Sequence, residues 1–232
     1  MGAAVALGDY TTGMILEVRQ RANQETTDEP NAFIRDNEIR TWLNAELAEL
    51  IEVIDENEDD PYRQTLAPAI VTASGTDTYA LPADFKAIVS VDVYWGTNMV
   101  RSAKRFNEWE RNRYKAWPQL WGYTMPLYYR TLGQNLVIQP VPQGAVTLYV
   151  HYLPAFQPLV NKTDTFDSVN QWHEYAVWGA VAQCQRKDDD DPSYAISMQA
   201  KVADRVRNMV GKRNQAEPPH IAQTRGPWRY DE

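Results

Sequence analysis

The run Arg186-Lys-Asp-Asp-Asp-Asp191 is the longest series of consecutive carboxylates in the sequence, and such a series can attract a divalent cation. Calcium-binding loops, however, place their oxygen ligands at alternate positions and need a glycine at the turn, which this run lacks. The pattern favours a loop between two helices, in which Asp191 caps a helix with Pro192 at its first position. We therefore expect no metal ion. A metal-dependent hydrolase or nuclease that uses Asp188–Asp191 is the third of three candidate functions.

The other residue types that often mark an active site form none of the common motifs. The three histidines, His151, His173 and His220, belong to no HExxH motif, and the eleven glycines form neither GxGxxG nor GxxxxGK[ST]. A GxSxG motif is also absent. We expect a protein with no catalytic residue and no cofactor.

Aromatic and arginine side chains gather in the segment 102–123, for which we predict a short helix that ends before Pro118. Such a mixture can stack on nucleic-acid bases or sugars, or it can bind a partner protein. It can also be a helix that covers an open end of a sheet with its aromatic side. The residues concerned are Trp109, Tyr114, Trp117, Trp121 and Tyr123, with Arg105, Arg111 and Arg113.

Charge is spread unevenly over a chain whose formal net charge is -8. Glu46–Asp60 holds eight acidic residues and no basic one, whereas Arg101–Lys115 holds six basic and two acidic residues. An acidic protein is a poor candidate for wrapping DNA, since affinity for DNA comes from neutralised phosphates. The charged runs are either solvated helix faces or complementary contact surfaces.

We expect this chain to contain no disulfide, no signal peptide and no transmembrane segment. Its single cysteine, Cys184, excludes an internal disulfide. The first residues lack the basic region of a signal peptide, and no run of about 18 apolar residues is present.

Hydrophobic spacing divides the chain into helical and β regions. Apolar residues at steps of three and four predict four helices: 12–23 capped by Thr11 or Thr12, 38–58 capped by Asp36 or Asn37, 169–187 capped by Asp167 or Ser168, and one from Pro192 to Gly211. Between them the period changes to two, most clearly in Phe85–Trp95. We expect at least five mostly antiparallel strands. These include a strand ending at Leu81, a proline-enforced corner at Pro82, a hairpin of Leu127–Thr131 with Leu136–Gln139, and Val146–Tyr152.

The predicted fold is therefore α+β. Residues 1–62 and 163–213 supply two N-terminal and two C-terminal helices of a helical bundle, and residues 63–162 form an inserted antiparallel β domain. Residues 214–232 form an extended C-terminal arm that is too polar to fold alone.

The order of these segments resembles that of head-to-tail adaptor (connector) proteins of tailed bacteriophages, including the tail tubular protein A type. The resemblance rests on WLNAELAELI, YALPADFKAIVSVDVYW, the phrase Leu136-Val-Ile-Gln-Pro-Val-Pro142, LYVHYLPAF and WHEYAVWGAVAQCQRKDDDD. It covers nearly the whole chain.

The resemblance implies a dodecameric ring beneath the portal protein, in the virion at the head-tail interface, assembled in the cytoplasm of the host bacterium. Such a ring has no active site, connects the portal to a tail or head-closure (nozzle) protein, and lets DNA pass without sequence-specific binding. The C-terminal arm would dock on the portal through Arg225, Trp228, Arg229 and Tyr230.

Two surfaces are expected to serve the ring or the tail partner. One is acidic, with Glu49, Glu52 and Glu56; the other is basic and aromatic, with Arg105, Trp109, Arg111 and Arg113. The second candidate function is a carbohydrate- or receptor-binding tail component that uses the aromatic residues between Trp109 and Tyr123 as a stacking platform.

Overall fold

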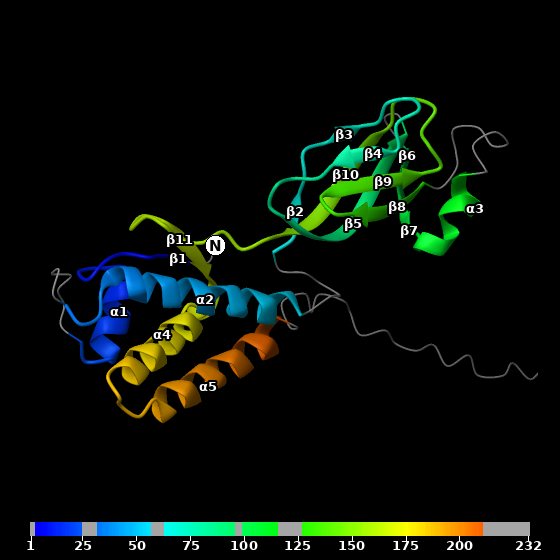
Figure 1. The fold of residues 1–232 in the computed structure, drawn as a ribbon. Helices are drawn as coiled ribbons and strands as arrows, with labels where there is room; N and C mark the ends of the chain where they lie inside the picture. The colour runs from blue at the N-terminus through cyan, green and yellow to red at the C-terminus, as the bar shows by residue number, and fades with distance from the viewer. Residues whose placement is uncertain (1–2, 25–31, 57–62, 96–98, 116–126, 211–232) are drawn as a thin grey trace, which may run out of the picture.

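The computed structural model describes residues 3–24, 32–56, 63–95, 99–115 and 127–210 (Figure 1). The fold is α+β, as predicted, with five α-helices and mostly antiparallel strands in this part of the chain. The helices are α1 (Gly13–Arg21), α2 (Asp36–Asp55), α3 (Arg111–Lys115), α4 (Glu174–Lys187) and α5 (Ser193–Val210), with two 3-10 turns, η1 (Glu108–Glu110) and η2 (Val169–Gln171). The strands are β1 (Ala3–Ala6), β2 (Thr65–Leu66), β3 (Ile70–Val71), β4 (Thr78–Ala80), β5 (Phe85–Trp95), β6 (Met99–Ser102), β7 (Lys104–Arg105), β8 (Tyr128–Leu132), β9 (Asn135–Gln139), β10 (Thr147–Pro154) and β11 (Thr165–Ser168).

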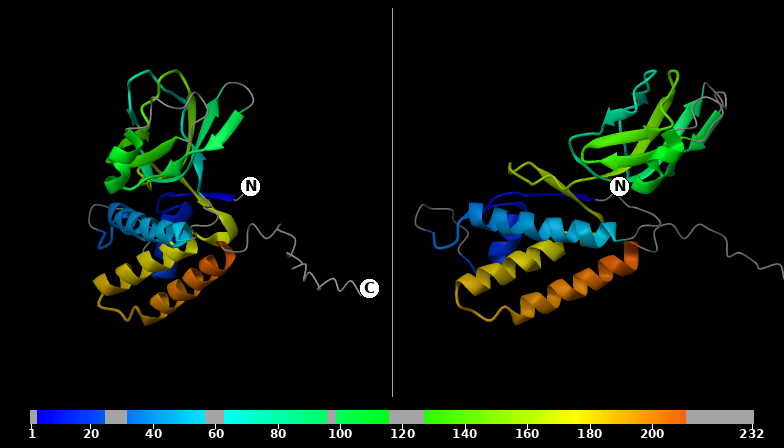
Figure 2. Two further views of the ribbon diagram at one scale, coloured as in Figure 1. Left: turned by 90° about the vertical axis from the view of Figure 1, so that its right-hand side faces the viewer. Right: turned by 45° about the vertical axis from the view of Figure 1, so that its right-hand side comes forward.

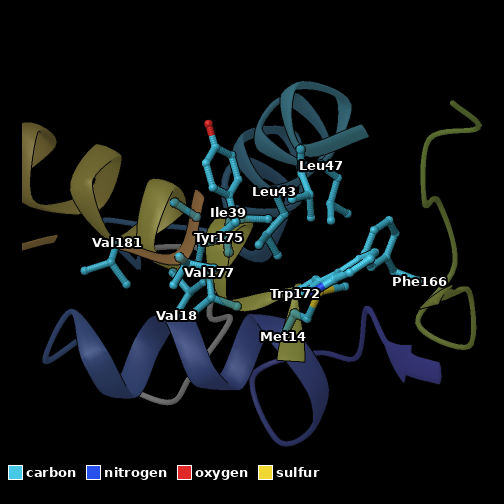
Figure 3. Packing of buried hydrophobic residues seen from close by; sticks show 14 of the residues in the cluster. Met14, Val18, Ile39, Leu43, Leu47, Phe166, Trp172, Tyr175, Val177 and Val181 are labelled. Atoms are coloured by element: carbon cyan, nitrogen blue, oxygen red, sulfur yellow. The ribbon is translucent and has the colours of Figure 1, made fainter. Parts of the chain in front are cut away.

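One hydrophobic core lies among α1, α2, α4 and α5. The apolar side of α2 carries the fully buried Leu43, Leu47 and Leu50. It faces the part of α4 that carries small residues, and these let the two helices approach closely. Figure 3 shows the same core from close by, with Trp172 beside Phe166. Burial of each large apolar side chain contributes roughly 1.5–3 kcal/mol, so this core is the main source of stability for the helical part.

The start of α2 differs in detail from the prediction. Arg35 is the N-cap residue, and its N–H donates to the Glu38 carboxylate at 3.0 Å. Asp36 and Asn37, the two predicted caps, are instead the first residues of the helix, and Asp36 binds the buried Arg19 of α1, with Oδ1 2.6 Å from Nη2. Arg19 also donates to the Ile34 carbonyl oxygen at 3.1 Å. This pair therefore joins α1 to the start of α2.

A strand pair that the sequence did not reveal closes the helical part on one side. β1 pairs antiparallel with β11, so that Val5 lies opposite Phe166. The prediction that Asp167 or Ser168 caps a helix beginning at Val169 was wrong, because both residues belong to β11, and α4 begins only at Glu174. The pairing joins residues about 160 positions apart, which no local pattern can show.

The second core lies between two sheets. Strands β2, β10, β5 and β6 form one sheet in that order, with β3 also on β10, and strands β4, β9, β8 and β7 form the other. Val91, Leu136, Leu148 and Val150 meet between them and are fully buried. The predicted hairpin is confirmed as β8 and β9, which turn at Gly133 and Gln134. All described strand pairs are antiparallel except β7 with β8.

The predicted corner at Pro82 carries the chain from one sheet to the other, since β4 belongs to the second sheet and β5 to the first. The Phe85 N–H donates to the Pro82 carbonyl oxygen at 3.1 Å, so Pro82 is the first residue of a turn. Asp84 then accepts a hydrogen bond from the Tyr152 hydroxyl at 3.0 Å. The corner is thereby fixed to β10.

Asp55, at the end of α2, connects the helical part to the sheets. Its carboxylate lies 2.9 Å from Lys86 Nζ of β5 and 3.4 Å from Arg63 Nη1. In Figures 1 and 2 the two sheets lie on the side of α2 that faces away from α5.

Glu46 is a buried carboxylate between three helices. Its Oε2 accepts a hydrogen bond from Gln199 of α5 at 2.6 Å. Gly179 of α4 leaves the space for it, because a Cβ there would lie 2.3 Å from the Glu46 carboxyl carbon. Burial raises the pKa of Glu46 above its ordinary value, and the charge of Glu49 raises it further.

Asp36→Ala is expected to lower the free energy of unfolding by about 3–5 kcal/mol, because the buried Arg19 guanidinium loses the carboxylate that compensates its charge. Urea unfolding followed by circular dichroism measures the change. Asp204→Ala is the control, since it removes an exposed carboxylate 3.6 Å from Arg207 and should cost less than about 0.5 kcal/mol. Equal stability of the two variants would contradict the role of Asp36.

Glu46→Gln should change the pH dependence of stability. A raised folded pKa means that the contribution of Glu46 is fully present below the unfolded value of 4.5 and is lost as pH rises through the folded pKa. The stability of Glu46→Gln relative to the wild type should therefore rise across this window and then stay constant. Urea unfolding at a series of pH values tests this, with Glu52→Gln as an exposed control, and a constant difference throughout would refute it.

Candidate interaction surfaces

The acidic residues Asp188–Asp191 lie in the loop between α4 and α5. The Asp191 carboxylate accepts hydrogen bonds from the N–H and the hydroxyl of Ser193, at 3.0 and 2.5 Å, and these bonds lower the pKa of Asp191. The Asp191 side chain thus holds the start of α5, but the helix begins at Ser193 and not at Pro192 as predicted. Asp188, at the other end of the loop, accepts a hydrogen bond from Gln24.

The described residues contain neither a candidate metal site nor a candidate membrane-crossing helix. Over residues 3–24, 32–56, 63–95, 99–115 and 127–210, no group of three or more His, Cys, Asp or Glu side chains could hold a metal ion. None of the described helices is both long and apolar enough to cross a membrane.

The aromatic and basic segment forms one end of the β part. The turn η1 and helix α3 lie beside β7, β8 and β9 (Figure 1). Tyr114 of α3 stacks on Tyr128 of β8 with ring centroids 4.0 Å apart, and its edge meets Phe106. The covering role considered from the sequence therefore applies to Tyr114. Trp117, Trp121 and Tyr123 lie outside the described residues.

Trp109 has a different environment, since 88% of its surface is exposed. Arg105, Arg111 and Arg113 are exposed in the same short stretch, and we call these four residues the basic tip. Trp and Arg are the residue types that contribute most to protein–protein binding energy. A tryptophan this exposed adds nothing to the core, so the basic tip is suited to contact another molecule.

Arg130 of β8 adds a further positive charge that the sequence did not place here. It forms an ion pair with Glu108, which also lies 2.6 Å from Arg111. Arg105, Glu108 and Arg130 line a shallow polar pocket of about 310 Å³. The parallel pairing of β7 with β8 brings Arg130 to this place, and no sequence motif marks such a pairing.

The acidic run of α2 divides into two groups. Glu46 and Asp55 hold the fold together, whereas Glu49, Glu52 and Glu56 are exposed at steps of three and four, and we call these three the acidic surface. Glu49 accepts a hydrogen bond from the Tyr175 hydroxyl at 3.3 Å, and Glu56 lies 3.7 Å from Arg207. Burial, together with the charge of Glu49, raises the pKa of Tyr175 to about 12. The acidic surface is thus fixed in place by α4 and α5.

The basic tip and the acidic surface lie apart on the chain, on α3 with its neighbouring segments and on α2. No ion pair found in the described residues joins them. The residues of both surfaces are exposed to solvent. The predicted portal contacts Arg225, Trp228, Arg229 and Tyr230 lie outside the described residues and stay a prediction.

Comparison with known proteins gives one family. Residues 12–229 match the family model of the SU10 adaptor protein, a span that includes the core between the sheets, the helical core except Leu7 and Val5, and both surfaces. A search of curated proteins finds no match. The family confirms the resemblance to phage adaptors, while the tail tubular protein A type stays a prediction. Because the match covers far more than half of its length, the chain belongs to the SU10 adaptor protein family, a family of bacteriophage structural proteins.

Proposed function

We propose that this protein is the head-to-tail adaptor of a tailed bacteriophage and forms a ring, of twelve copies as the resemblance implies, beneath the portal. The ring connects the portal to a tail or head-closure (nozzle) protein, and DNA passes through its centre during packaging and ejection. The family match over residues 12–229 is the observation that supports this most strongly. The protein would then reside in the virion at the portal vertex, after assembly in the host cytoplasm.

The two charged surfaces provide a physical basis for such a ring. Neighbours in a closed ring meet through two different faces of the same chain. The basic tip and the acidic surface are oppositely charged and lie on different elements, so one copy can present the tip to the acidic surface of the next. Opposite charges also guide the two faces into register as they meet.

The acidic surface has a second possible place in the same ring, facing the channel. Carboxylates offer DNA no cations with which to replace its condensed counterions, so the duplex would slide without binding. Charge reversal distinguishes the two placements. If the acidic surface contacts the basic tip of the neighbouring subunit, reversing the charges of both surfaces restores assembly. If the acidic surface faces the channel, the second reversal restores nothing.

Reversing the basic tip (Arg105→Glu, Arg111→Glu and Arg113→Glu) should weaken ring assembly at least tenfold, because it places like charges opposite each other. Mixing this variant with a copy carrying Glu49→Lys, Glu52→Lys and Glu56→Lys should restore assembly. Negative-stain imaging and light scattering at low salt measure the rings, and Lys201→Glu, an exposed site on α5, is the control.

Wild-type assembly by the tip variant would exclude the tip as a ring contact. If the acidic-surface variant both assembles and packages DNA like the wild type, neither placement of the acidic surface holds.

The C-terminal contacts need a separate experiment. Trp228→Ala with Tyr230→Ala should abolish binding to the portal while leaving the fold unchanged, because the arm would lose its aromatic anchors. Co-sedimentation with purified portal and circular dichroism measure the two properties, with Gln223→Ala as a control in the same segment. Undiminished co-sedimentation of the double variant would discard the arm as the portal anchor.

A further inference from the structure

The helical part and the β part have separate hydrophobic cores, and the two cores have no residue in common. Each part therefore gains the free energy of its own apolar burial whatever its orientation to the other. The orientation has to depend on contacts that cross between the parts. Two such contacts reach the same place on the β part, the corner that follows Pro82.

The first contact is the chain segment that leaves β10, residues 155–159. At one end, the Ala155 N–H donates to the carbonyl oxygen of Asp84 at 2.6 Å. At the other end, Leu159 is buried in the helical core and forms two hydrogen bonds of 2.9 Å with the side chain of Asn44. This segment holds the β part to the middle of α2, but a single connection leaves rotation about it open.

The second contact is the carboxylate of Asp55, the last residue of α2. Its Oδ2 lies 2.9 Å from Lys86 Nζ on β5 and 3.4 Å from Arg63 Nη1, just before β2. Only 6% of the Asp55 side chain is exposed, and its buried Oδ1 accepts no hydrogen bond from a described residue. A buried carboxylate needs compensating charge, and here both cations belong to the β part. The pairing of this charge therefore depends on the position of the β part.

We propose that Asp55 fixes the angle between the β part and the helical part, and with it the angle between the basic tip and the acidic surface. Asn44 and Asp55 lie about 16 Å apart along α2, at a rise of about 1.5 Å per residue. Contacts at two points this far apart prevent a rotation that either point alone allows. The acidic surface lies on α2 and the basic tip on the β part, so the same two contacts set the angle between the surfaces.

This inference deepens the proposed function, and its consequence for the ring rests on that function. When subunits meet through two different faces, the rotation from one subunit to the next decides whether a ring closes or an open chain grows. A variable angle between the faces would give rings of mixed size or open chains. Asp55 is thus a positioning residue, which controls ring closure without being part of either surface.

Double electron–electron resonance on the full-length protein measures the orientation of the two parts. Spin labels at Lys201→Cys on α5 and Leu132→Cys on β8 report the distance between them, and both sites are exposed. The native Cys184 is fully buried, and burial raises the pKa of its thiol to about 12, so it should stay unlabelled. Dilution with unlabelled protein restricts the measured distances to those within one chain.

The protein with Asp55 intact should give one narrow distance distribution. Asp55→Asn should make it at least about twofold broader, because the neutral amide no longer holds the two cations. Lys86→Met keeps the aliphatic chain and should broaden it less, since Arg63 remains. Asp204→Asn is the control, because it removes an exposed carboxylate that pairs with Arg207 inside the helical part. Circular dichroism and thermal melts show whether each variant is folded.

Negative-stain imaging of the same variants measures the effect on the ring. Asp55→Asn should give rings of several sizes or open chains, whereas Asp204→Asn should assemble as the unchanged protein does. Rings of one size from Asp55→Asn would show that the assembled ring, and not Asp55, sets the angle.

Equal widths of the distance distribution with and without Asp55 would overturn the inference, as would a broad distribution in the unchanged protein. If Asp55→Asn does not fold, Lys86→Met decides between the same two results. If the distribution depends on Asp55 but the unchanged protein forms no ring, the proposed function fails while the role of Asp55 in fixing the angle stands.

Discussion

The burial of the apolar side of α2 against α4 is the constraint on which the rest of the structure depends. Leu43, Leu47 and Leu50 are fully buried, and α4 offers small side chains where the two helices meet. Once α2 is held in this way, its other features have fixed positions. Asp36 at its start receives Arg19, Asp55 at its end receives Lys86 of the β part, and its exposed side carries the acidic surface. A single helix thus relates the helical core, the sheets and one candidate interface.

The features that fit an adaptor are exposed surfaces that a soluble monomer rarely carries. Trp109 is almost fully exposed among arginines and adds nothing to the core of the isolated chain. A protein whose role is to join other proteins needs such surfaces, because binding energy comes from area that the free subunit leaves open. Membership of the SU10 adaptor protein family agrees with this interpretation.

The charged residues of α2 show how a single stretch of sequence can serve two purposes. Glu46 is buried against Gly179 and Gln199, where it has a raised pKa, while Glu49 and Glu52 point to solvent one turn or more further along. A count of acidic residues cannot separate these roles. The separation arises because a helix turns about 100° per residue, so neighbouring acids face different surroundings.

The sequence by itself determined the elements whose signal is local. Steps of three and four located α2 and α5, alternation located β5, and Pro82 marked the corner, because each of these depends on residues within one or two turns of the chain. Only the tertiary structure decided what depends on distant partners. The pairing of β1 with β11 and the arrival of Arg130 at the basic tip both require strands from separate parts of the chain to lie side by side. Their physical cause is the burial of shared apolar area and the pairing of backbone hydrogen bonds, which a linear pattern does not encode.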